Sequence, residues 1–185
     1  MIIGEKSDFA IECYRDSASD HHQVLGRICC WAKNEPIGSI ETTGCMIATS
    51  VNQFERTLEH LEKQMADWFG MESDQNVFDT IYEWNCGDNP PEAACPHGYG
   101  IHYFITSDGD SFTDIESFIR KKTDAIQLMI MDVADEDHGK PVPRIYNVSI
   151  DGFHRTVDEF IDWYNKQEIS QQNGAHNYGG SPASV

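Results

Sequence analysis

An amphipathic stripe in the first half of the chain limits the possible folds more than any other feature of the sequence. Between residues 51 and 69, apolar side chains recur at steps of three and four residues, the spacing of one face of an α-helix. The stripe consists of Val51, Phe54, Leu58, Leu61, Met65, Trp68 and Phe69. Ser50 and Gln53 predict a capping box at its start, and Gly70 predicts its end. Such a helix needs other elements to cover its apolar face, so the chain must also supply a core.

Apolar segments with strand-like patterns lie before and after this helix. The expected strands are residues 7–14, 24–32, 37–41, 45–49, 101–106, 125–134 and 144–150. Residues 33–36, Lys-Asn-Glu-Pro, are typical of a turn and would join the second and third strands in a hairpin. The run at 125–134 is the most apolar segment, which predicts a central strand.

Further helices are expected in the second half of the chain. A short one starts near residue 73, and a last one starts at Thr156, which can form a capping box with Glu159. The inner face of the last helix is expected to consist of Val157, Phe160, Ile161 and Tyr164. Residues 112–119 are also assigned to a helix, although the same residues would suit a strand.

This order of elements predicts a single α+β domain, with helices packed mainly on one face of an antiparallel sheet. We expect the domain to span residues 1–169. Residues 170–185 are polar and rich in Gly, Ser and Asn, which predicts a C-terminal tail. A chain of 185 residues is long enough to bury one sizeable core.

The formal net charge of −18 is unevenly distributed along the chain. Residues 64–119 contain no Lys or Arg, but they contain Asp67, Glu72, Asp74, Asp79, Glu83, Asp88, Glu92, Asp108, Asp110, Asp114 and Glu116. Proteins that bind nucleic acid or anionic membranes use clustered cations, so neither is expected as a partner. A cation-free acidic surface instead favours the capture of a basic protein, although such a segment can also be a merely solvated face.

Trp84 lies in this acidic segment, off the apolar stripe of its predicted helix, and is a candidate anchor for a partner. The pattern places Trp31, Trp68 and Trp163 in the core instead. The residues predicted to bind a partner are therefore Asp67, Glu72, Asp74, Asp79, Glu83, Trp84, Asp88 and Glu92.

The N-terminal residues lack the cationic lead and apolar run of a signal peptide, and no segment is apolar enough to span a membrane. The six cysteines do not follow the spacing of a disulfide module. Cys29 and Cys30 are adjacent within an apolar run, as expected of buried free thiols. We therefore expect a cytoplasmic protein.

The main enzymatic alternative is a metal or thiol site formed by Cys86, Cys95 and His97, with His102 as a further ligand. Eight residues separate the two cysteines, which is wider than the usual spacing in structural zinc sites. No nucleophile elbow or other catalytic signature is present. We therefore expect no metal, no cofactor and no enzymatic activity.

The first quarter of the chain resembles bacterial immunity proteins of polymorphic toxin systems, in particular the immunity protein forty-two family. That family similarly begins with an M-I-x-G-x-x-x-x-F-A-I-E strand, followed by a G-[KR]-x-C-x-W strand and an I-G-x-x-E hairpin. The residues that carry the resemblance are Met1, Ile2, Gly4, Phe9, Ala10, Ile11, Glu12, Gly26, Arg27, Cys29, Trp31, Ile37, Gly38 and Glu41. These positions have the character of strand and hairpin residues, so they identify no binding site.

The resemblance implies a non-enzymatic protein that binds a cognate secreted toxin and neutralises it. Many such toxins are nucleases, which are basic because they hold phosphates, and this agrees with the acidic segment. Two alternatives stay open at this point, namely the metal or thiol enzyme and a generic acidic adaptor. A homo-oligomer is possible, but the sequence does not indicate one.

Overall fold

A computed structural model describes residues 1–16, 24–63, 73–79, 104, 110–132 and 142–176. The strands are β1 (Ile2–Gly4), β2 (Phe9–Arg15), β3 (Leu25–Ala32), β4 (Glu35–Ile37), β5 (Cys45–Met46), β6 (Ile115–Lys121), β7 (Ile126–Asp132) and β8 (Arg144–Val148). The helices are α1 (Ile47–Lys63), a helical segment at 74–79, the 3₁₀ turn η1 (Asp110–Phe112) and α3 (Ile150–His176). Antiparallel sheets combined with helices confirm the predicted α+β class.

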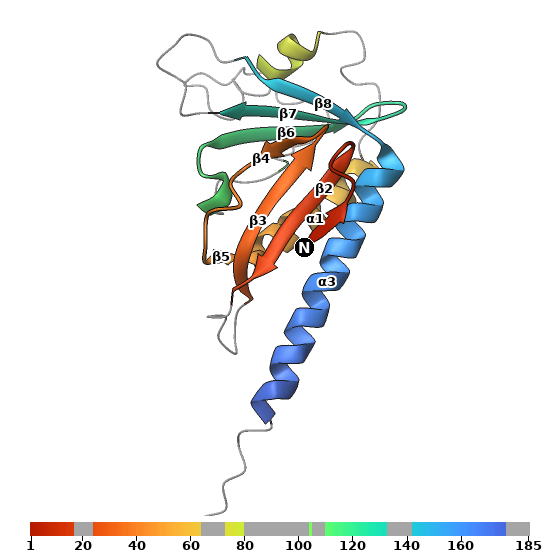
Figure 1. The fold of residues 1–185 in the computed structure, drawn as a ribbon. Coiled ribbons are helices and arrows are strands. Elements are labelled where there is room, and N and C mark those ends of the chain that lie inside the picture. The colour runs from red at the N-terminus through yellow and green to blue at the C-terminus, as the bar shows by residue number, and fades with distance from the viewer. Residues whose placement is uncertain (17–23, 64–72, 80–103, 105–109, 133–141, 177–185) are drawn as a thin grey trace, which may run out of the picture.

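The first sheet is antiparallel, with the order β1-β2-β3-β4, and β5 also pairs with β3. Helix α3 lies alongside β1 and β2, and α1 lies behind the sheet, as Figure 1 shows. Phe9 of β2 packs on Phe153 of α3, with 4.8 Å between the ring centroids. Phe54 of α1 meets Phe160 of α3 at 5.7 Å. Both helices therefore cover the same face of this sheet, the face that carries Phe9 and Ile11.

The second sheet has the order β6-β7-β8 and crosses above the first sheet (Figure 1). The side chains of Ile126, Leu128 and Ile130 on one face of β7 belong to the core that the two sheets share. On its other face, Met129 and Met131 pack with Phe118 and with Val77 and Phe78 of the 74–79 segment. The second sheet is thus covered with apolar groups on both faces, and β7 is its central strand, as the sequence predicts.

The assignment of residues 112–119 to a helix is wrong, because most of this segment forms β6. Phe118 points into one apolar cluster and Ile119 into the other, so consecutive residues are buried. A strand covered on both faces loses the alternation that identifies a half-exposed strand, which explains the error.

Both long helices begin before their predicted caps. Helix α1 starts at Ile47, where the backbone N–H donates to the carbonyl of Val24 at 3.2 Å, so Ser50 lies inside the helix. Helix α3 starts at Ile150, and Ser149 caps it by accepting from the N–H of Gly152 at 3.1 Å. Thr156 is a buried residue within that helix. The inner faces of both helices are nevertheless as predicted wherever they are described.

The hairpin turn is shorter than predicted. It consists of Lys33 and Asn34, both at positive φ, as a two-residue hairpin requires. Glu35 and Pro36 already belong to β4, where Pro36 occupies a short edge strand. Helix α3 extends past residue 170 to His176, and no described helix is long and apolar enough to span a membrane.

Two glycines of the N-terminal motif have a packing role. Gly4 has a φ of 84°, and a Cβ there would lie 2.3 Å from the hydroxyl of Thr156 on α3. Gly38 has a φ of 85°, and a Cβ there would lie 2.4 Å from the ring of Phe112. Both positions therefore need glycine for close approach and for backbone conformation.

Candidate functional site

Most of the predicted partner-binding residues lie outside the described part of the chain. These are Asp67, Glu72, Glu83, Trp84, Asp88 and Glu92, and the same holds for Cys86, Cys95, His97 and His102 of the alternative metal or thiol site. Asp74 and Asp79 are described, and both lie on the 74–79 segment. Among the described residues, no group of His, Cys, Asp and Glu could hold a metal ion.

Asp74 holds its helical segment against the second sheet. Its carboxylate accepts from Arg120 of β6 at 2.5 Å and from Gln127 of β7 at 3.1 Å, and Lys122 lies 3.8 Å away. The Arg120 side chain is only 8% exposed, and burial lowers the pKa of its guanidinium while Asp74 opposes that shift. Arg120 near the end of β6 and Lys122 just after it therefore neutralise Asp74, although the acidic segment before them in the sequence contains no cation.

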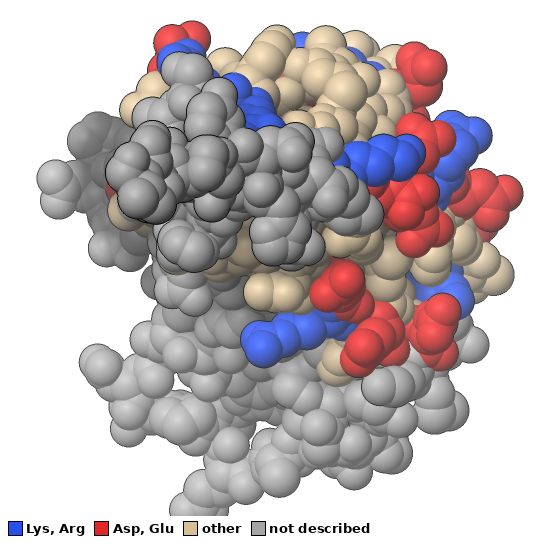
Figure 2. Space-filling model, turned by 90° about the horizontal axis from the view of Figure 1, so that it is seen from below, with Lys and Arg blue, Asp and Glu red and all other residues tan. Residues whose placement is uncertain are grey.

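Asp79 accepts a hydrogen bond at 2.9 Å from the side chain of Gln75, one helical turn earlier. The described acids are also interspersed with cations elsewhere on the surface. In Figure 2, which shows the molecule from below, Lys and Arg side chains lie next to Asp and Glu side chains. This described surface is therefore of mixed charge.

The face of the first sheet that points away from the helices carries a different kind of site. In the register of β2 and β3, Ala10 pairs with Trp31, Glu12 with Cys29 and Tyr14 with Arg27. Ile2 pairs with Glu12, and Met46 pairs with Leu25. Directly paired residues share a face of a sheet, and so do alternate residues of one strand. We call the resulting surface the open face, which includes Ile2, Tyr14, Leu25, Arg27, Trp31 and Met46.

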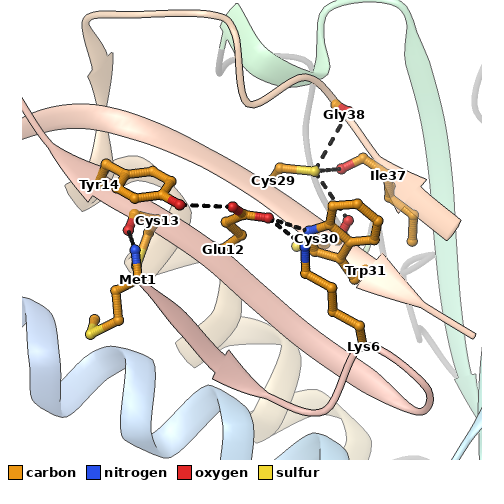
Figure 3. A network of polar contacts seen from close by, with 10 residues as sticks. All are labelled: Met1, Lys6, Glu12, Cys13, Tyr14, Cys29, Cys30, Trp31, Ile37 and Gly38. Atoms are coloured by element: carbon orange, nitrogen blue, oxygen red, sulfur yellow. Dashed lines mark hydrogen bonds and ion pairs between the residues drawn. The ribbon is translucent and has the colours of Figure 1, made fainter. Parts of the chain in front are cut away.

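Glu12 is the centre of a hydrogen-bond network on the open face (Figure 3). Its carboxylate accepts from the ammonium of Lys6 at 2.8 Å, from the indole of Trp31 at 2.9 Å and from the hydroxyl of Tyr14 at 2.9 Å. The hydrogen bond from Lys6 is the main reason why the pKa of Glu12 is lowered. The hydrogen bond to Glu12 also raises the pKa of Tyr14.

Lys6 also lies over the ring of Trp31, with 3.4 Å between its ammonium and the ring centroid. This is a cation–π contact, so Lys6 holds both the carboxylate and the indole. Beside them, the thiol of Cys29 lies 3.4 Å from the carbonyl oxygen of Ile37. The network therefore fixes the side chains of Tyr14 and Trp31 on a partly exposed face, on which Ala10 and Cys29 are buried and Tyr14 is 45% exposed.

Large apolar side chains are exposed around this network. Ile2 is 48% exposed, Tyr14 45% and Met46 49%, and all three belong to the open face. Trp31, which the sequence places in the core, is half-buried on this face instead. This surface is not evident from the sequence, because all residues from Cys29 to Ala32 are apolar and their pattern does not distinguish those that point outward. The alternation of Phe9, Ile11 and Cys13 with Glu12 and Tyr14 was the available signal.

A second polar network joins the two sheets. The hydroxyl of Tyr146 on β8 donates to Glu35 on β4, and Arg144 donates to that hydroxyl at 3.2 Å. Arg144 also donates to Asp132 of β7 at 3.1 Å. Burial is the largest of the effects that raise the pKa of Tyr146 to about 12. These contacts fix the position of the first sheet relative to the second.

The described cysteines are structural. Cys13, Cys29, Cys30 and Cys45 are all buried and free, and the sequence predicted this burial for Cys29 and Cys30. Burial raises the pKa of Cys13 to about 12 and that of Cys29 to about 11. A thiol attacks as its thiolate, so Cys13 and Cys29 are unsuited to act as nucleophiles.

Comparison with known proteins gives a family and a fold. The family model described as Immunity protein 42 matches residues 1–163. A crystal structure of CdiI from Burkholderia dolosa AUO158 has a similar fold, with a TM-score of 0.63 at 11% sequence identity, over 88% of this chain and 99% of that chain. No curated protein matches the chain. The family model spans both sheets and the first half of α3, and we conclude that the chain belongs to the Immunity protein 42 family.

Proposed function

We propose that this protein binds a cognate secreted toxin domain and neutralises it by occupying its surface, without catalysing a reaction. The match of the Immunity protein 42 family to residues 1–163 is the observation that carries the proposal. The raised pKa values of Cys13 and Cys29 support a packing role for these thiols. An inhibitor of this kind acts inside the producing cell, so we expect it in the cytoplasm.

We further propose that the toxin domain is basic, as a nuclease would be. The net charge of −18 supports this, because a strongly acidic protein attracts a cationic partner over long range and raises the rate of encounter. The residues expected to contribute most are those of the cation-free segment at 64–119. Neither nucleic acid nor a membrane is expected to compete for this surface.

The direct test uses the toxin domain encoded beside the gene for this chain. Mixing the two purified proteins should give a stoichiometric complex, and co-expression should protect cells from the toxin. A toxin domain that neither binds the protein nor loses toxicity in its presence would contradict the proposal. This test uses the intact chain, so its outcome does not depend on which surface binds the toxin.

Charge reversal tests the electrostatic part separately. The triple variant Glu83→Lys, Asp88→Lys and Glu92→Lys should lower the association rate constant about tenfold or more at low salt and weaken its salt dependence. Asp74 is left unchanged because it pairs with Arg120 inside the fold. The matched control reverses Asp158, Glu159 and Asp162, which are exposed on α3. Equal rates for the two triple variants would show that the acidic segment has no special part in capture.

A further inference from the structure

We propose that the toxin docks on the open face of the first sheet, with Tyr14 and Met46 as apolar anchors beside the Glu12 network. This inference rests on the proposed function and names the surface that performs it. Both anchors are close to half exposed, at 45% for Tyr14 and 49% for Met46. Neither residue belongs to the acidic segment from which the sequence predicted binding.

The composition of the open face fits the centre of a protein interface. Such centres are enriched in Tyr, Trp, Met and Arg and depleted in Lys, Glu and Asp. The outward residues include Tyr14, Arg27, Trp31 and Met46, with Ile2 beside them. Covering their exposed apolar area would favour association, because apolar surface is removed from water.

The charges of the open face are already paired, which lowers the cost of covering them. Glu12 is largely covered, with 12% of its side chain exposed, and Lys6 meets both Glu12 and Trp31. Arg27 lies 3.7 Å from Asp16. A charge that loses water on binding is costly unless it has partners, and these groups keep theirs.

The open face is also pre-organised for binding. Tyr14 and Trp31 both donate to Glu12, so their rings are held before any partner arrives. The strand pairs below them are continuous from Phe9 to Arg15. Side chains that are already ordered lose less conformational entropy on association.

The charge of the chain favours a toxin domain over a second copy as the occupant of this face. Two copies would each contribute a net charge of −18 and would repel one another. A cationic domain with an apolar patch would be attracted by the same charge and could then cover the open face. The acidic segment would thus set the rate of encounter, and the open face would set the lifetime of the complex.

The test measures binding kinetics of the toxin domain encoded beside this gene to the full chain. The double variant Tyr14→Ala and Met46→Ala should weaken affinity at least about 30-fold, mainly through faster dissociation. Val142→Ala is the control, because Val142 is 78% exposed but lies next to β8, in the other sheet. An unchanged affinity of the folded double variant would overturn the inference, while the proposed function would stand if the wild-type chain still bound.

A second measurement avoids any effect of the substitutions on folding. Dilute peroxide oxidises exposed methionines, so Met46 in the wild-type chain should react readily, unlike the buried Met131. Adding the toxin domain should slow oxidation of Met46 at least about tenfold if that residue is covered. Full reactivity of Met46 within a formed complex would overturn the inference. Light scattering that shows a dimer dissociated by the double variant would also overturn it, in favour of a second copy.

Discussion

The two sheets of this protein differ in how many of their faces are covered by other elements. The second sheet is covered on both faces, by the shared core on one side and by the 74–79 segment on the other. The first sheet is covered by α1 and α3 on one face, and its other face exposes Ile2, Tyr14 and Met46. Among the described residues, the open face therefore combines exposed apolar side chains with aromatic side chains that are already held in place, as a docking surface requires.

The polar networks of the two sheets differ in the same way. On the second sheet, Arg120 and Gln127 use their hydrogen bonds to hold Asp74, and with it a helical segment, against the strands. On the first sheet, Glu12 holds only the side chains of the face itself. One network attaches a covering element, whereas the other keeps an exposed surface rigid.

The largest expected difference between the two sheets is in the loss of stability when a large apolar side chain is replaced by alanine. Phe118→Ala removes a fully buried ring that packs on Phe78 at 5.4 Å, so it should lower the free energy of unfolding by about 3–5 kcal/mol. Met46→Ala on the open face should lower it by less than about 1 kcal/mol. Urea unfolding of the two variants measures both values. Similar losses would mean that the open face is part of the core.

The next difference in stability is expected between substitutions of Arg120 in the second sheet and Arg27 in the first. Arg120→Met leaves Asp74 and Gln127 without their main donor, so it should lower the free energy of unfolding by about 2–3 kcal/mol. Arg27→Met removes a longer, exposed contact with Asp16 and should cost less than about 1 kcal/mol. Urea unfolding again provides the comparison. An unchanged free energy of unfolding in Arg120→Met would show that Asp74 does not hold its helical segment against the second sheet.

A smaller effect is expected in how the stability contributed by Glu12 depends on pH. The pKa of Glu12 is lowered from its ordinary value of 4.5, so its ionised form stabilises the fold. This contribution is fully present above pH 4.5 and is lost as the pH falls through the lower value of the folded state. Glu12→Gln should therefore destabilise the chain at about pH 6, by less than about 1 kcal/mol, and the gap should narrow at about pH 3.5.

Unfolding of the wild type and Glu12→Gln in urea at the two pH values checks this result. Glu55→Gln, at an exposed position of α1, provides a matched loss of one carboxylate outside the network. A gap between wild type and Glu12→Gln that stays constant from about pH 6 to about pH 3.5 would show that the network does not stabilise the charged carboxylate.

The sequence predicted the parts of the fold that depend on local periodicity. The stripe of α1, the central strand β7 and the inner face of α3 all follow from spacing along the chain. It did not predict contacts between distant residues. Asp8 accepts from Ser149 at the start of α3, and this contact fixes a helix start that local sequence placed at Thr156.

The candidate site depends even more on such distant pairs. Glu12 and Trp31 are 19 residues apart, and only the register of β2 and β3 brings them together. Asp74 meets Arg120 across 46 residues, so the absence of cations near it in the sequence did not predict its surroundings. Charge counts along a chain describe long-range attraction, whereas the shape of a docking surface requires the register of its strands.

Cross-linking from the open face tests the central claim most directly. A photoreactive phenylalanine analogue placed at Tyr14 should cross-link to the toxin domain within the complex, whereas the same analogue at Val142 should not. Both positions are exposed; Tyr14 lies in β2 of the first sheet, and Val142 lies two residues before β8 of the second sheet, which makes them a matched pair. Cross-linking from Val142 with none from Tyr14 would contradict the account and place the toxin on another face.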